Sequence, residues 1–160
     1  MHPRVGGLSR GVRLGVDVGA VRVGVAVCDP DGILATPLST LARDRRTDQE
    51  IGDGSVPTDI AELARLVTER AAVAVVVGLP VTLAGRDGFA AAEVRAYARR
   101  LSGVIDPVPV LLADERMSTV VATRRLSERG IRGKRQRAVV DQVAAVEILQ
   151  SWLETQRRRT

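Results

Sequence analysis

The chain has 160 residues, which suits a single domain, and its one cysteine, Cys28, excludes an internal disulfide and a cysteine-based zinc site. Lysine and arginine outnumber aspartate and glutamate by 24 to 19, and the net charge of +5 predicts an anionic partner such as nucleic acid. No stretch is apolar enough to span a membrane, and residues 1–12 lack the hydrophobic region of a signal peptide. We therefore expect a cytoplasmic protein with a disordered basic tail over 1–12.

The first half of the chain predicts three consecutive strands. Alternating apolar residues indicate strands at about 13–18 and 22–28, joined by a tight turn. A third strand is expected over 33–41, where Pro37 is typical of a sheet edge. The polar residues 42–56 predict a mobile loop before the first helix.

The second half of the chain predicts alternating helices and strands. Helices are expected over about 58–70, 87–102, 118–129 and 138–156, with a basic loop at 130–137. The apolar run 72–80 predicts a central strand covered on both faces, and 107–115 predicts another buried strand. Because such alternation requires parallel strands, we predict an α/β domain over 13–156, with a mixed five-stranded sheet flanked by helices.

Asp17 is an unexpected residue in a half-buried strand. It shares a strand face with Gly15 and Gly19, and a simple hairpin register would add Gly24 and Ala26 to that face. A surface of such small residues allows another backbone or a ligand to come close. An isolated aspartate could also serve only to accept hydrogen bonds from nearby amides, so its role depends on whether other carboxylates converge on it.

Three further carboxylates are candidates to meet Asp17. Asp114 and Glu115 end a predicted strand, at the edge where open α/β sheets bind ligands, and only one of the two can face the same way as Asp17. Asp141 begins the apolar stripe of the last predicted helix, where it could alternatively serve as a capping residue. Because that stripe must pack on the sheet, we expect Asp141 to approach Asp17.

Four ordered motifs resemble those of the YqgF (RuvX) family over about 13–153: "DVGAVRVGVA", "VGLP", "DERMST" and "DQVAAVEIL". That family comprises ribonuclease H-like nucleases, assigned to Holliday junction resolution and to pre-16S rRNA processing. The resemblance implies a ribonuclease H-like fold and an acidic triad of Asp17, Glu115 and Asp141, with Asp114 beside it.

Some positions depart from the family pattern. Thr82 and Ala84 stand where the loop after "VGLP" usually carries Asn and Asp-Gly, and Cys28 replaces a usual serine. The loop differences bear on substrate contacts and leave the acidic triad unchanged.

Phosphodiester hydrolysis explains why such acids would be needed. Two hard cations about 3.5–4 Å apart can activate water and neutralise the charge at the reacting phosphate. Mg²⁺ (or Mn²⁺) prefers oxygen ligands, so we expect Asp17 to bridge two metals, with Glu115 and Asp141 each completing one site. The single histidine, His2, lies in the N-terminal tail, so metal-activated water is the expected nucleophile.

Basic residues near these acids are the candidate nucleic-acid contacts. Arg22 either touches a phosphate near Asp17 or lies on a solvated strand end, and Arg116 could pair with Asp114 or with substrate. The basic run 129–137 precedes Asp141 closely, which favours phosphate contact over a solvated surface. The complete predicted set is Arg22, Arg86, Arg116, Arg132, Lys134, Arg135 and Arg137.

Three classes of function fit the sequence. The first is a metal-dependent nuclease that processes the 5′ end of pre-16S rRNA, or alternatively a Holliday junction resolvase acting as a two-fold dimer. The second is a non-catalytic module that binds nucleic acid. The third follows from the pattern DxGxxxxGVAV, which also resembles a phosphate loop of actin- and hexokinase-type ATPases, although those need two lobes. We favour the nuclease, acting on structured RNA rather than branched DNA, as a monomer or weak homodimer.

Overall fold

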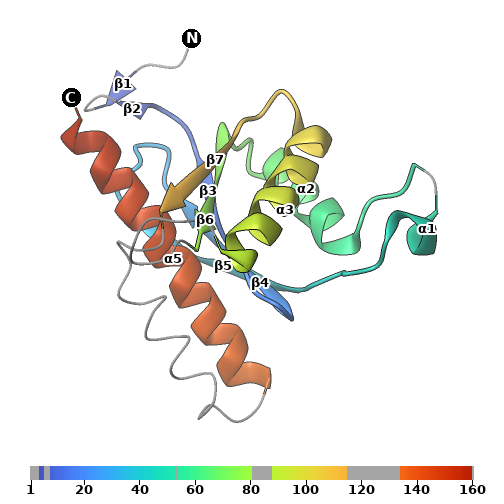
Figure 1. Cartoon of the computed structure of the whole chain (residues 1–160). Coiled ribbons are helices and arrows are strands. Elements are labelled where there is room, and N and C mark those ends of the chain that lie inside the picture. Colours follow the sequence, from blue (N-terminus) through green and yellow to red (C-terminus); the bar gives the residue numbers. More distant parts are fainter. Residues whose placement is uncertain (1–3, 6–7, 53, 81–87, 115–133, 160) are drawn as a thin grey trace.

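A five-stranded mixed sheet forms the centre of the molecule (Figure 1). The computed structural model describes residues 4–5, 8–52, 54–80, 88–114 and 134–159. The strand order is β5-β4-β3-β6-β7, with β3 (Arg13–Val18), β4 (Arg22–Cys28), β5 (Ala35–Ala42), β6 (Ala74–Leu79) and β7 (Val110–Asp114). The pairs β3–β4 and β4–β5 are antiparallel, whereas β6 runs parallel to both β3 and β7. The predicted mixed five-stranded sheet is confirmed.

Helices cover both faces of this sheet (Figure 1). On one face, α2 (Thr58–Glu69) and α3 (Phe89–Ile105) pack against alternate residues of the strands, such as Leu14 and Val16. On the other face, α5 (Lys134–Arg158) packs against a separate cluster that includes Ala26 and Val76. None of the described helices is long and apolar enough to cross a membrane.

Strand β6 is an interior strand, between β3 and β7, and is covered on both faces, as its apolar run predicts. All six of its residues are buried. The neighbouring β7, also expected to be buried, is instead at the edge of the described sheet, and Leu112 is 39% exposed. An apolar run does not reveal whether a strand lies at the edge of the sheet, where its two faces are covered less completely than those of an interior strand, and this is why the prediction of a buried strand was wrong.

Strand β5 is the other edge, as Pro37 predicts. The register between β4 and β5 shifts between Val25 and Ala26, and Pro37 faces Ala26 just after the shift. Proline has no N–H to donate to a ladder, so a bulge on an edge strand accommodates it.

Two segments are more ordered than expected. The polar stretch 42–56 contains a short helix, α1 (Asp48–Ile51), which begins with a capping box between Thr47 and Glu50. Within the expected disordered tail, β1 (Arg4–Val5) pairs with β2 (Leu8–Ser9), and Leu8 is buried. Both corrections have a local cause: a side-chain cap in the first case and an apolar anchor in the second.

The predicted helices need smaller adjustments. Helix α3 continues to Ile105, and α5 begins at Lys134, so residues 134–137 of the expected basic loop belong to the helix. The helix expected over 118–129 lies outside the described residues.

Candidate active site

The small-residue face predicted around Asp17 exists, and a helix backbone occupies it. Asp17 pairs with Gly24, and Gly15 pairs with Ala26. A Cβ atom on Gly24 would lie 2.2 Å from the backbone oxygen of Asp141, far inside van der Waals contact. A Cβ atom on Gly15 would lie 2.6 Å from the Cβ of Leu149. The glycines therefore serve the close packing of α5 on β3 and β4.

This packing brings two of the predicted carboxylates to the same place. The backbone of Asp141 lies on Gly24, which is the register partner of Asp17. Both acids are buried, with Asp17 1% and Asp141 4% exposed. They come from segments more than a hundred residues apart, and they lie toward the edge where the parallel strands β3, β6 and β7 end. That edge is where open α/β sheets place their ligands.

Arg22 contacts the protein's own acid at this site. Its Nε donates a hydrogen bond to Oδ2 of Asp141 at 2.8 Å, and the two side chains are 20% and 5% exposed. Arg22 lies two positions before Gly24 on β4, so it is on the same face as Asp17. The sequence allowed Arg22 to lie on a solvated strand end, but in the structure its side chain is largely buried in an ion pair with Asp141.

Asp114 lies on the opposite face of the sheet. Its register partner is Leu79, which belongs to the core beneath α2 and α3, whereas the preceding Ala113 packs against the core beneath α5. Alternation along β7 thus separates the exposed Asp114 from Asp17 and argues against Asp114 as a metal ligand.

The other predicted contacts are only partly within the described structure. Glu115, Arg86, Arg116 and Arg132 lie outside the described residues. For Lys134, Arg135 and Arg137 the structure describes the helical backbone, in the first turn of α5.

The two buried aspartates suit a hard divalent cation in the chemistry of their donor atoms. Among the described residues there is no group of three or more histidine, cysteine or acidic side chains able to hold a metal. Asp17 and Asp141 nonetheless supply buried carboxylate oxygens, the donors that Mg²⁺ and Mn²⁺ prefer. The pair fits the expected metal in donor chemistry and would need further oxygen ligands to complete a site.

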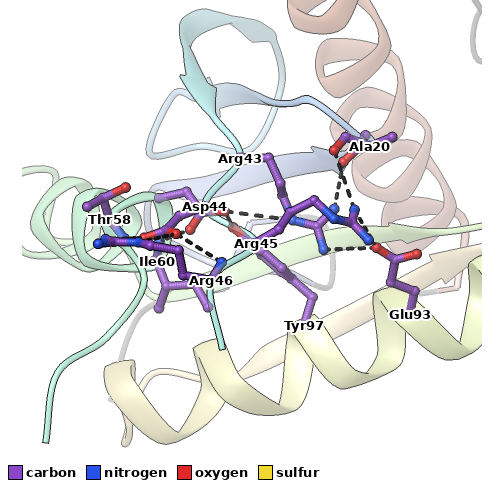
Figure 2. Close-up of polar contacts among 11 residues, drawn as sticks. Ala20, Arg43, Asp44, Arg45, Arg46, Thr58, Ile60, Glu93 and Tyr97 are labelled. Carbon is purple, nitrogen blue, oxygen red and sulfur yellow. Dashed lines mark hydrogen bonds and ion pairs between the residues drawn. The ribbon is translucent and has the colours of Figure 1, made fainter. Parts of the chain in front are cut away.

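The turn between β3 and β4 is held by a second group of residues that sequence reasoning missed (Figure 2). The backbone N–H of Arg43 donates to the carbonyl of Val21 at 2.8 Å, and its Nη1 donates to the carbonyl of Gly19 at 2.7 Å. The guanidinium of Arg45 lies 3.4 Å from the carbonyl of Ala20. Two arginines of the segment after β5 thus hold all three carbonyls of the turn that joins Val18, the last residue of β3, to Arg22.

Arg43 is itself fixed by three side chains from the helices. It lies 3.2 Å from Glu93 and 3.9 Å from Asp59, and its guanidinium carbon is 5.0 Å from the ring centre of Tyr97. The hydroxyl of Tyr97 donates to the buried Asp59 at 2.9 Å. Burial, together with the neighbouring Asp59 carboxylate, raises the pKa of Tyr97 well above its usual range. Asp59, Glu93 and Tyr97 come from two helices that are far from Arg43 in the chain, so the local sequence carries no signal for this network.

A large hollow lies at the other end of the strands. Its volume is about 820 Å³, and its walls include Arg13 and Ala74, the first residues of β3 and β6, together with Trp152. Neither Asp17 nor Asp141 lines it. This pocket is therefore separate from the acidic site.

Comparisons with known proteins agree with the motifs. The family model described as "RuvX: Holliday junction resolvase" matches residues 11–155. A protein of Mycobacterium sp. (strain KMS) is 54% identical over 156 residues, covering 98% of this chain and 87% of its own. A protein of Rhodococcus erythropolis is 47% identical over 157 residues, covering 98% and 85%. Both relatives carry the name "Putative pre-16S rRNA nuclease".

A solved structure supports the fold. Thermus thermophilus RuvC matches with a TM-score of 0.50 at 13% identity, over 90% of this chain and 95% of that one. The arrangement of the mixed sheet and its helices is thus ribonuclease H-like. With the family model matching nearly the whole chain, and close relatives matching over almost their full length, this protein belongs to the RuvX family.

Proposed function

We propose that the protein is a metal-dependent nuclease that processes the 5′ end of pre-16S rRNA. The observation that carries the proposal is the meeting of two buried carboxylates, Asp17 and Asp141, on one face of the sheet. Asp141 is paired with Arg22, and a second buried acid, Asp17, lies on the same face of the sheet, so this cluster of ionisable groups is a candidate functional site. The names of the relatives direct the choice of substrate toward precursor rRNA.

In this proposal, Asp17, Asp141 and Glu115 hold the divalent cations. The face on which Asp114 lies leaves Glu115 as the third acid. When bound, Mg²⁺ or Mn²⁺ would supply charge neutralisation at the reacting phosphate and would lower the pKa of a water molecule. The chain contributes rigidity, because Asp17 is on a central strand and Asp141 is on a helix packed directly against it.

Basic residues would bind the nucleic-acid backbone around the acids. Lys134 and Arg137 lie seven and four positions before Asp141 in α5, which is roughly 10 Å and 6 Å along the helix axis. We assign the same role to Arg86, Arg116, Arg132 and Arg135. Phosphate contacts of this kind position a substrate without reading its sequence.

Parallel cleavage assays test the proposal. The purified chain is incubated with a 5′-extended 16S leader RNA and with a synthetic four-way DNA junction, each with Mg²⁺, with Mn²⁺ and with a chelator. We expect metal-dependent cleavage of the leader RNA. No cleavage of either substrate under any metal condition would contradict the proposal.

Junction resolution is the second candidate, because it is the activity given in the description of the matching family model. A resolvase must cut two strands symmetrically and therefore needs a two-fold dimer. Paired symmetric nicks on the junction, together with a dimer in sedimentation experiments, would favour this activity over RNA processing.

A further inference from the structure

We propose that Arg22 is a resident counter-ion of the acidic site, which divalent cations displace from Asp141 and which then contacts a phosphate of the substrate. The inference rests on the proposed nuclease function and deepens it, since it names the group that competes with the metal. Arg22 would thus have two successive partners, first Asp141 and then a phosphate of the substrate.

The geometry explains why Arg22 is bound to Asp141 before any cation arrives. The carboxylate of Asp141 is 5% exposed and lies where a helix packs on the sheet, so it requires a positive or hydrogen-bonding partner. Arg22 supplies one from β4 through a charge-assisted hydrogen bond of 2.8 Å. That bond occupies Oδ2, one of the two oxygens with which Asp141 would hold a cation.

The alternative is that Arg22 supports Asp141 as a metal ligand by orienting it, as hydrogen bonds often do around metal sites. The charges argue against this role. A divalent cation on Asp141 would lie within a few ångströms of the guanidinium, and at that separation the repulsion exceeds the gain from a single charge-assisted hydrogen bond. The two roles predict opposite effects of removing Arg22: tighter metal binding if it competes, and weaker binding if it supports.

Release is possible because Arg22 lies at the border of the site. Its side chain is 20% exposed, whereas that of Asp141 is almost fully covered. Arg22 is the first residue of β4 and follows the turn that Arg43 and Arg45 hold, so its backbone stays fixed while its long side chain can turn outward. A guanidinium that has turned outward from Asp141 would still lie on the face of the sheet where the reacting phosphate would bind.

Calorimetric titration with Mn²⁺ tests the competition without measuring cleavage. Arg22→Ala should bind Mn²⁺ about tenfold more tightly than the wild-type chain, because no cation has to be displaced. Arg22→Lys keeps a positive charge and should remain within a few-fold of wild type. Arg10→Ala is the matched control: it also removes one arginine from an ion pair, with Asp31, but that pair is half-exposed and includes no residue of the acidic site.

Binding of nucleic acid tests whether the displaced Arg22 contacts a phosphate of the substrate. With Ca²⁺ in place of Mg²⁺, the slope of log K against log[salt] on a duplex should become shallower by about one unit in Arg22→Ala. With a chelator the slope should not change, because Arg22 is then held by Asp141. Thermal unfolding of each variant confirms that it is folded.

The outcomes separate the inference from the function on which it rests. Unchanged or weaker Mn²⁺ binding by Arg22→Ala, with wild-type cleavage intact, would overturn the role of Arg22 alone. The same slope change with and without Ca²⁺ would also overturn it. A wild-type chain that binds no Mn²⁺ and cleaves nothing would overturn both proposals.

Discussion

Single residues at the candidate site are held by partners that lie far away in the sequence. Asp17 pairs with Gly24, on which α5 packs, Asp141 is bound by Arg22 from β4, and the turn between β3 and β4 is held by Arg43. Each of these contacts joins segments from different elements, so the position of each side chain at the site depends on the packing of the whole domain.

Asp17→Asn should lower cleavage more than about 100-fold and leave nucleic-acid affinity nearly unchanged, because asparagine keeps the shape and removes the charge that holds the cations. Single-turnover cleavage and binding of the same RNA measure the two effects. Asp114→Asn is the control, since it makes the same chemical change on the opposite face of the sheet and should keep wild-type cleavage. Cleavage by Asp17→Asn at the wild-type rate would contradict the assignment.

Tyr97 predicts how stability changes at high pH. Because the pKa of Tyr97 is raised in the folded chain, the unfolded chain releases the phenolic proton first, and the free energy of unfolding falls as pH rises above the ordinary tyrosine value near 10. The slope from this group approaches about 1.4 kcal/mol per pH unit. Urea unfolding between about pH 9 and about pH 11 measures it.

Tyr97→Phe isolates this contribution. Burial also raises the pKa of Cys28, so its thiol contributes to the pH dependence of unfolding in the wild-type chain. Because Tyr97→Phe keeps Cys28, subtracting the slope of the variant from that of the wild type leaves the contribution of Tyr97. The chain has one tyrosine, so phenolate absorbance should appear together with unfolding. Absorbance that rises near pH 10 while the chain stays folded would contradict the prediction.

At the scale of elements, the contact between α5 and the β3–β4 hairpin determines the site. The helix backbone approaches Gly24 and Gly15 more closely than any side chain would allow. The position of Asp141 relative to Asp17 therefore depends on glycine at these two strand positions.

Gly24→Ala should destabilise the fold by about 1–3 kcal/mol, because the added methyl group meets backbone atoms of Asp141, which cannot turn away as a side chain can. Gly103→Ala is the control: nothing lies within 4 Å of the added atom in α3, and alanine should stabilise the helix by about 0.5–1 kcal/mol. Chemical denaturation measures both changes. A Gly24→Ala chain as stable as wild type would show that α5 lies farther from the sheet.

The elements also show what the sequence could predict. The glycine face around Asp17 and the buried β6 followed from strand alternation and from an apolar run, which are local properties. The exposure of β7 and the network around Arg43 depend on which elements become neighbours in the fold. A local sequence pattern does not predict these neighbours. The partner of Arg22 is 119 positions away, and neither of the two roles that the sequence suggested for Arg22, a phosphate contact or a solvated strand end, included a contact with Asp141.

For the whole molecule, the excess of positive charge should strengthen binding to nucleic acid. Whether nucleic acid binds to one particular surface depends on how the basic residues are distributed. Of the basic positions before Asp141, Lys134, Arg135 and Arg137 lie in the first turn of α5, within about two turns of Asp141 on the same helix. The other described arginines are distributed over several elements, among them Arg70 just after α2, Arg99 within α3, and Arg158 and Arg159 at the C-terminal end of α5.

Replacing the basic group before Asp141 with alanine should weaken binding to all nucleic-acid sequences alike, because phosphate contacts do not distinguish bases. The substituted residues are Arg132, Lys134, Arg135 and Arg137. If all four contact duplex phosphates, the slope of log K against log[salt] should become shallower by about 3–4 units. The matched control removes the same charge from the exposed arginines Arg70, Arg99, Arg158 and Arg159. It should change the slope by less than about one unit, since a distant charge releases few counterions from the bound nucleic acid. Equal slopes for the two quadruple variants would mean that binding depends on net charge and not on a defined surface beside the acids.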